Sequence, residues 1–138
     1  MTDELMWRVS DDSSGLREPR VFIRAFLEPG TLERAVACYE RAQGVTADGR
    51  FAFKTLRLAM VGAFLLIEGT ADDLRPYRST TGTLLVNEIA PYHERLVAEG
   101  AEITVAPARV PTGAGFTARH PDGTTVEYVE HRPTAEGF

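Results

Sequence analysis

The chain has 138 residues, of which 43% are hydrophobic and 25% are charged, the balance of an ordinary globular protein. This length predicts one domain, or two small modules that share one core. The chain carries 15 Lys and Arg residues against 20 Asp and Glu residues, for a net charge of −5. Because nucleic-acid binders normally present a basic stripe to the phosphates, this composition argues against nucleic acid as a partner.

The sequence also argues against membrane insertion and secretion. The longest apolar run, near Ala63–Ile67, is far shorter than a membrane-spanning helix requires. The first 15 residues carry acidic side chains and lack the apolar segment of a signal peptide. A single cysteine, Cys38, excludes an internal disulfide and a cysteine-based zinc cluster. We therefore expect a cytoplasmic protein with no membrane contact.

The first half of the chain predicts a strand, a helix and two further strands. Residues 1–19 are rich in acidic side chains and turn formers, so we expect an N-terminal tail. A run of β-branched and aromatic residues then predicts a strand, and apolar residues at helical spacing predict a helix between the N-cap Thr31 and Gly44. The expected strands cover residues 21–27, 53–60 and 63–69.

After a linker over residues 70–80, the same order repeats. We expect a strand over 81–87, a helix over 88–99 that Gly100 ends, a strand over 102–110, and a hairpin of strands 115–119 and 124–131. The tetrapeptide His120-Pro121-Asp122-Gly123 between the hairpin strands suits a type I turn.

The repeat predicts an α+β fold of two βαβββ modules, residues 20–69 and 81–131. Neither module is large enough to fold alone, so we expect their sheets to form one curved mixed sheet around a concave cleft, with the helices outside. The domain then covers residues 20–133, and residues 134–138 form a C-terminal tail.

Strand alternation assigns each side chain to the helix side or to the cleft. In the first strand, Val21, Ile23, Ala25 and Leu27 are assigned to the helix side. In the next two strands the larger apolar side chains are assigned to the helix side as well: Leu56, Leu58, Met60, Leu65 and Ile67.

The cleft face then combines large apolar groups with charged and polar ones. A concave, largely apolar surface with a few polar groups is typical of a small-molecule site, and a face buried against a partner subunit is the alternative. The candidate ligand-binding residues are Phe22, Arg24, Phe26, Arg57, Phe64, Leu66, Glu68, Thr81, Leu85 and Glu127.

Two stretches resemble a known superfamily. Residues Val21–Val45, VFIRAFLEPGTLERAVACYERAQGV, resemble the first strand and helix of the vicinal oxygen chelate superfamily, and His120–His131, HPDGTTVEYVEH, resembles its terminal hairpin. The superfamily includes glyoxalases, bleomycin-resistance proteins, fosfomycin-resistance enzymes and extradiol dioxygenases. Its metal-dependent members hold one metal with four side chains, which the resemblance places here at Arg24, Glu68, Thr81 and Glu127.

These four residues argue for a metal-free member that has no cofactor. Arg24 cannot ligate a metal because its guanidinium offers only donors, and Thr81 is a poor ligand. A buried carboxylate needs a partner, so we expect Arg24 to pair with Glu68, Glu127 or both.

We therefore expect a metal-independent small-molecule binding protein of the glyoxalase and bleomycin-resistance type, with an apolar or aromatic ligand in the cleft. The alternative is a glyoxalase-like lyase, isomerase or dioxygenase that uses Glu68 or Glu127 as a base or metal ligand. A third possibility is a regulatory or assembly partner, and the resemblance implies a homodimer. No residue is assigned a catalytic role, and His93, His120 and His131 are expected at the surface. His120 is also a candidate proton carrier at the open end of the second module.

Overall fold

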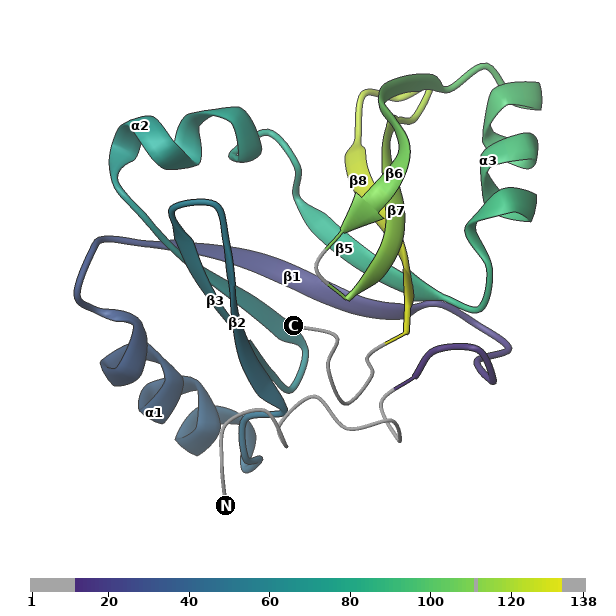
Figure 1. Ribbon diagram of the computed structural model, residues 1–138. Coiled ribbons are helices and arrows are strands. Elements are labelled where there is room, and N and C mark those ends of the chain that lie inside the picture. The colour runs from purple at the N-terminus through teal and green to yellow at the C-terminus, as the bar shows by residue number, and fades with distance from the viewer. Residues whose placement is uncertain (1–11, 111, 133–138) are drawn as a thin grey trace.

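The computed structural model describes residues 12–110 and 112–132, which form one eight-stranded mixed sheet with two long helices on its outer face (Figure 1). The strands are β1 (Arg20–Leu27), β2 (Gly49–Phe53), β3 (Leu56–Val61), β4 (Phe64–Glu68), β5 (Gly82–Val86), β6 (Glu102–Val110), β7 (Gly113–Arg119) and β8 (Thr125–His131). The helices are α1 (Leu32–Gln43), α2 (Ala71–Leu74), the 3₁₀ helix η3 (Arg75–Tyr77) and α3 (Ile89–Ala98). None of these helices is long and apolar enough to span a membrane.

The expected α+β fold of two βαβββ modules is confirmed. The strand order is β2-β3-β4-β1-β5-β8-β7-β6. In each module the first and last strands pair in parallel, β1 with β4 and β5 with β8, and the antiparallel β1–β5 pair joins the modules. Helices α1 and α3 lie outside the sheet at its two ends (Figure 1).

Two regions of the chain differ from the expectation. Strand β2 was not expected, and it forms a hairpin with β3 through a turn in which Lys54 has a φ of 55°. A positive φ is uncommon outside glycine, so the sequence carries no turn signal at this point. The expected linker over residues 70–80 contains α2 and η3.

The described part of the predicted N-terminal tail lies against the end of β8. The backbone N–H of Ser13 donates to the carbonyl oxygen of His131 at 3.0 Å, and the N–H of His131 donates to Oγ of Ser13 at 2.9 Å. Leu16 packs against the cluster on the concave face of the sheet. Residues 1–11 of that tail and the C-terminal tail predicted over 134–138 lie outside the described residues.

Each long helix covers one apolar cluster on the outer face of the sheet. The α1 cluster consists of Leu32, Val36, Ala59, Val61 and Leu66. The α3 cluster consists of Val86, Ile89, Phe116, Ala118, Val126 and Tyr128. Only the second half of β1 contacts α1, through Ala25 and Leu27. Val21 and Ile23, which were expected to face a helix too, are about half exposed.

The faces of β3 and β4 are the reverse of the expected ones. Leu56, Leu58, Met60, Leu65 and Ile67 lie on the concave face with Phe22, whereas Ala59, Val61, Phe64 and Leu66 face α1. Both faces of these strands are apolar and buried, so alternation alone does not distinguish them. The register is instead fixed by the tight turn at Gly62, which has a φ of 60° and places Val61 opposite Phe64.

A glutamate from the last strand of each module accepts a hydrogen bond from the first N–H of that module's helix. Glu68 Oε2 accepts from the N–H of Leu32 at 2.9 Å, and Glu130 Oε1 accepts from the N–H of Ile89 at 2.9 Å. These bonds satisfy donors that a helix N-terminus leaves unpaired, and the carboxylates favour the positive end of the helix dipole. Thr31, the expected N-cap of α1, makes no side-chain cap bond.

The buried cap of α1 predicts a loss of stability in Glu68→Ala. The substitution leaves the N–H of Leu32 without its acceptor in a buried position, so we expect a loss of about 1–3 kcal/mol of unfolding free energy in urea. Glu68→Gln is the matched control, because its amide oxygen can still accept, and it should lose less than half as much. Wild-type stability in Glu68→Ala would contradict this role.

Candidate functional site

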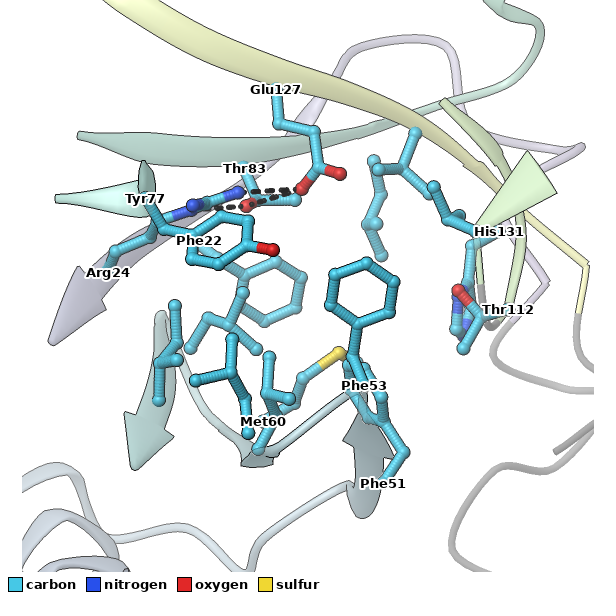
Figure 2. A pocket seen from close by; sticks show the side chains of 17 residues that line it. Phe22, Arg24, Phe51, Phe53, Met60, Tyr77, Thr83, Thr112, Glu127 and His131 are labelled. Atoms are coloured by element: carbon cyan, nitrogen blue, oxygen red, sulfur yellow. Dashed lines mark hydrogen bonds and ion pairs between the residues drawn. The ribbon is translucent and has the colours of Figure 1, made fainter. Parts of the chain in front are cut away.

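The concave face encloses an apolar cavity of about 110 Å³ (Figure 2). Its apolar lining comes from both modules: Phe22, Phe51, Phe53, Leu56, Leu58, Met60, Leu65, Ile67, Leu85, Val110 and Val129. Its polar lining consists of Arg24, Tyr77, Thr83, Thr112, Glu127 and His131. Apolar cavities of roughly 150 Å³ accept benzene, so this inner cavity has the size of about one ring.

A wider hollow of about 420 Å³ adjoins the inner cavity. The two share Arg24, Phe53, Tyr77, Val110 and Glu127, so these residues lie at the boundary between them. The outer hollow is lined by more polar groups, including Ser79, Thr80, Thr104, Thr117 and Arg119. The site therefore has a small apolar interior and a broader polar vestibule.

Arg24, Thr83 and Glu127 form a hydrogen-bonded triangle at this boundary. Nη2 of Arg24 donates to Oε1 of Glu127 at 2.8 Å, and Nε of Arg24 donates to Oγ1 of Thr83 at 3.1 Å. The Thr83 hydroxyl donates in turn to the same Glu127 oxygen at 3.2 Å (Figure 2). The side chains of Arg24 and Glu127 are 8% and 23% exposed, so this ion pair is largely shielded from water.

The strand register identifies which positions are equivalent in the two modules. The capping residue Glu68 lies opposite Leu27, and its counterpart Glu130 lies opposite Val86. Three residues earlier in each strand, Arg24 lies opposite Leu65, and Thr83 lies opposite Glu127. Glu68 is therefore the equivalent of Glu130, not of Glu127.

The four central positions are thus Arg24, Leu65, Thr83 and Glu127, all of which line the cavity. They differ at two places from the set that the resemblance implied. Glu68 faces α1, and Thr81 is exposed, with its hydroxyl donating to the carbonyl oxygen of Thr125 at 3.3 Å. Neither Glu68 nor Thr81 lines the inner cavity.

The central side chains do not fit a divalent cation. Leu65 offers no donor atom, Arg24 offers only protons, and one oxygen of the single carboxylate already accepts from Arg24 and Thr83. Biological metal sites need several oxygen, nitrogen or sulfur ligands in a defined geometry. Within residues 12–110 and 112–132, no group of three or more His, Cys, Asp and Glu side chains could hold a metal ion.

The structure brings four of the ten candidate residues together around the cavity: Phe22, Arg24, Leu85 and Glu127. The expected pairing of Arg24 with Glu127 is present, whereas the pairing with Glu68 is absent. Phe26 lies on the concave face but outside the lining, beneath the guanidinium of Arg78.

The other candidates lie elsewhere. Arg57 pairs with Glu68 at 3.3 Å on the helix side, Phe64 and Leu66 pack against the α1 cluster, and Thr81 is exposed. The assignment of Arg57, Phe64, Leu66 and Glu68 to the cleft face is therefore wrong, because β3 and β4 present the opposite faces.

Several lining residues were missing from the sequence-based set. Phe51 and Phe53 belong to the unexpected strand β2, and Tyr77 belongs to the expected linker. Thr83 and Val129 could have been identified from the sequence, because strand alternation places Thr83 on the same face as Leu85 and Val129 on the same face as Glu127.

His131 was expected at the surface, but it is 1% exposed and lines the inner cavity. Burial lowers the pKa of His131 to about 4. Arg20 and Arg132 add to this shift, and Asp12 and Asp48 oppose it. The imidazole is therefore neutral at pH 7.

The other two histidines lie outside the inner cavity. Nε2 of His120 is 2.7 Å from the hydroxyl of Tyr128, which belongs to the α3 cluster, and the ring of His93 contacts Phe116 edge-on. Neither His93 nor His120 lines the inner cavity beside the Arg24–Glu127 pair.

Similar chains are found among solved protein structures. No protein-family model and no curated protein matches the sequence. The chain is similar to an uncharacterized protein from Methanosarcina mazei, with 36% identity, a TM-score of 0.75, and coverage of 81% of this chain and 91% of that one.

Two structures of named proteins share the fold. Methylmalonyl-CoA epimerase from Mycobacterium tuberculosis is 17% identical with a TM-score of 0.59, covering 86% of this chain and 93% of that one. A mutant of 4-hydroxymandelate synthase from Streptomyces coelicolor is 19% identical with a TM-score of 0.55, covering 87% of this chain and 50% of that one. Identities this low show a common fold and leave the ligand of this chain open.

The shielded ion pair predicts that Arg24→Met is destabilising. Without Arg24, the Glu127 carboxylate is partly buried without a counter-charge, so we expect a loss of about 2 kcal/mol in urea unfolding, below the value for a fully buried pair. Arg119→Met removes an exposed pair with Glu102 and should cost less than about 1 kcal/mol. Equal effects of the two substitutions would contradict the burial argument.

The buried imidazole predicts that stability falls with acidification. Between the ordinary pKa of about 6.5 and the folded value of about 4, the unfolded state binds a proton at His131 that the native state does not. Unfolding free energy should therefore decrease by up to about 3 kcal/mol from this residue as the pH falls through that window. His131→Asn should show a shallower pH dependence in denaturant titrations, and an unchanged slope would oppose this assignment.

Proposed function

We propose that this chain, which shares its fold with methylmalonyl-CoA epimerase and 4-hydroxymandelate synthase, is a metal-independent member of the vicinal oxygen chelate superfamily that binds a small apolar or aromatic molecule in its inner cavity. The observation that carries this proposal is the Arg24–Glu127 ion pair at the centre of the cleft. A guanidinium at this place repels a divalent cation and occupies the carboxylate that would otherwise be available as a ligand.

The lining of the cavity supports a binding role. Phe22, Leu58 and Ile67 belong to the buried cluster of the concave face, yet they border open space instead of filling it. Protein interiors are otherwise close-packed, and an unfilled apolar space loses the dispersion contacts that a ligand would restore. A largely apolar cavity with a few polar groups at one side is also the usual form of a small-molecule site.

The enzymatic alternative receives less support from the geometry. It required Glu68 or Glu127 as a base or metal ligand, and Glu68 faces α1, where it caps the helix. Glu127 remains at the cleft, but one of its oxygens accepts from both Arg24 and Thr83. The described residues therefore offer no second carboxylate to act beside Glu127 in the inner cavity.

A titration with toluene, followed by backbone amide shifts in two-dimensional NMR, tests the proposed binding. We expect saturable shifts centred on residues around the cavity. Leu58→Phe should weaken toluene binding at least tenfold, because the larger side chain fills space that the ligand needs. Val97→Phe introduces the same residue on an exposed position of α3 and should leave the affinity unchanged.

Elemental analysis of the purified protein supplies the second part of the test. We expect far less than one equivalent of zinc, nickel, manganese or iron, and added Zn²⁺ or Ni²⁺ should not change the toluene affinity. A stoichiometric metal that Glu127→Gln removes would contradict metal independence. Absence of any saturable binding would contradict the binding role itself.

A further inference from the structure

At the boundary of the inner cavity, a carboxylate oxygen of Glu127 remains available as an acceptor, beside the hydroxyl of Tyr77. Oε1 of Glu127 accepts from both Arg24 and Thr83. No hydrogen bond from residues 12–110 or 112–132 reaches Oε2, which Figure 2 shows without a dashed line. A carboxylate oxygen is a strong acceptor, and leaving it unpaired when a ligand displaces its water is costly. A ligand that fills the cavity therefore gains by bringing a donor to this atom.

The charges around the cavity leave no counter-charge for an ionic ligand. Arg24 and Glu127 pair with each other, and the described residues of the lining include no other Arg, Lys, Asp or Glu side chain. His131, at the other side of the lining, is neutral at this pH because burial lowers its pKa to about 4. A carboxylate or ammonium group in the inner cavity would lose its hydration with no unpaired opposite charge to replace it.

The size of the cavity sets a further limit. About 110 Å³ accommodates roughly one ring, and the walls that surround it are aromatic and aliphatic. Figure 2 shows that Arg24, Thr83 and Glu127 lie together at one side of the cavity, and Met60 lies across from them. A ligand of matching chemistry has an apolar body and a single polar group at one end.

From these three observations, and resting on the proposed function, we propose that the ligand is an uncharged molecule of about one ring that carries a hydroxyl or N–H group and donates it to Oε2 of Glu127. A phenol or a small cyclic alcohol has this chemistry. The donor group forms a hydrogen bond to the carboxylate oxygen that otherwise has no partner among the described residues, and the ring occupies the space beside Phe22 and Leu58.

Competition between matched one-ring compounds for the wild-type protein tests this assignment. Phenol offers a donor, toluene offers no polar group, and anisole offers only an acceptor. Benzoate and benzylammonium add a negative and a positive charge. Affinities follow from amide shifts in NMR titrations at pH 7. We expect phenol to bind at least fivefold more tightly than toluene or anisole, and both ions to bind more weakly than phenol.

A variant that removes the whole ion pair identifies the acceptor. Arg24→Met combined with Glu127→Leu keeps the cavity apolar and leaves no uncompensated charge. This variant should still bind toluene, which shows that the cavity is intact, and should lose the preference for phenol. Arg75→Met combined with Asp72→Leu is the matched control, because it removes an exposed ion pair that lines neither hollow, and it should retain the preference.

The outcomes separate this inference from the proposed function. Binding of toluene or anisole as tight as that of phenol would overturn the donor requirement and leave the binding role intact. Tightest binding of benzoate or benzylammonium would overturn the requirement for an uncharged ligand. A phenol preference that survives in the double variant would overturn the assignment to Glu127. Failure of every compound to bind would overturn the proposed function and this inference together.

Discussion

The ion pair between Arg24 and Glu127 determines which polar groups are available at the centre of the cleft. It joins the first strand of one module to the last strand of the other, where both side chains are largely shielded from water. A charged group in such a place needs its partner, because removal of either one leaves the other uncompensated. The pair therefore places a charged, hydrogen-bonded boundary on a cavity whose other walls are mostly apolar.

The two modules share a frame and differ at the centre. Glu68 and Glu130 cap their helices from equivalent positions, which shows that the backbone pattern of one module is repeated in the other. Three residues earlier in each pair of strands, Arg24 and Leu65 in the first module correspond to Thr83 and Glu127 in the second. The repeated glutamates cap the helices, and the residues that differ set which polar groups line the cleft.

The second module was the easier half to predict, for a physical reason. Its strands β5 and β8 present polar residues such as Thr83 and Glu127 in phase with one face, so alternation assigned that face to the cleft. In β3 and β4 both faces are apolar and buried, so alternation did not distinguish the face toward the helix from the face toward the cleft. Choosing the bulkier residues for the helix side reversed both strands and moved Glu68 into the predicted site.

Other parts of the site depend on packing that local sequence does not encode. Strand β2 begins after a loop and ends in a turn at Lys54, a residue that seldom adopts a positive φ, so the sequence predicted one strand over 53–60 where the chain forms the β2–β3 hairpin. Tyr77 reaches the cavity from a short helix, and His131 is buried because the segment around Ser13 lies against the end of β8. These placements arise from tertiary contacts between segments far apart in the chain.

A double-mutant cycle between Arg24 and Glu127 tests the central claim most directly. The unfolding free energies of wild type, Arg24→Met, Glu127→Leu and the double variant give the energy of the interaction itself. We predict a coupling of about 1–3 kcal/mol, with the double variant more stable than at least one single variant. Strictly additive effects, with a coupling near zero, would show that the two charges do not constrain each other and would contradict this account of the cleft.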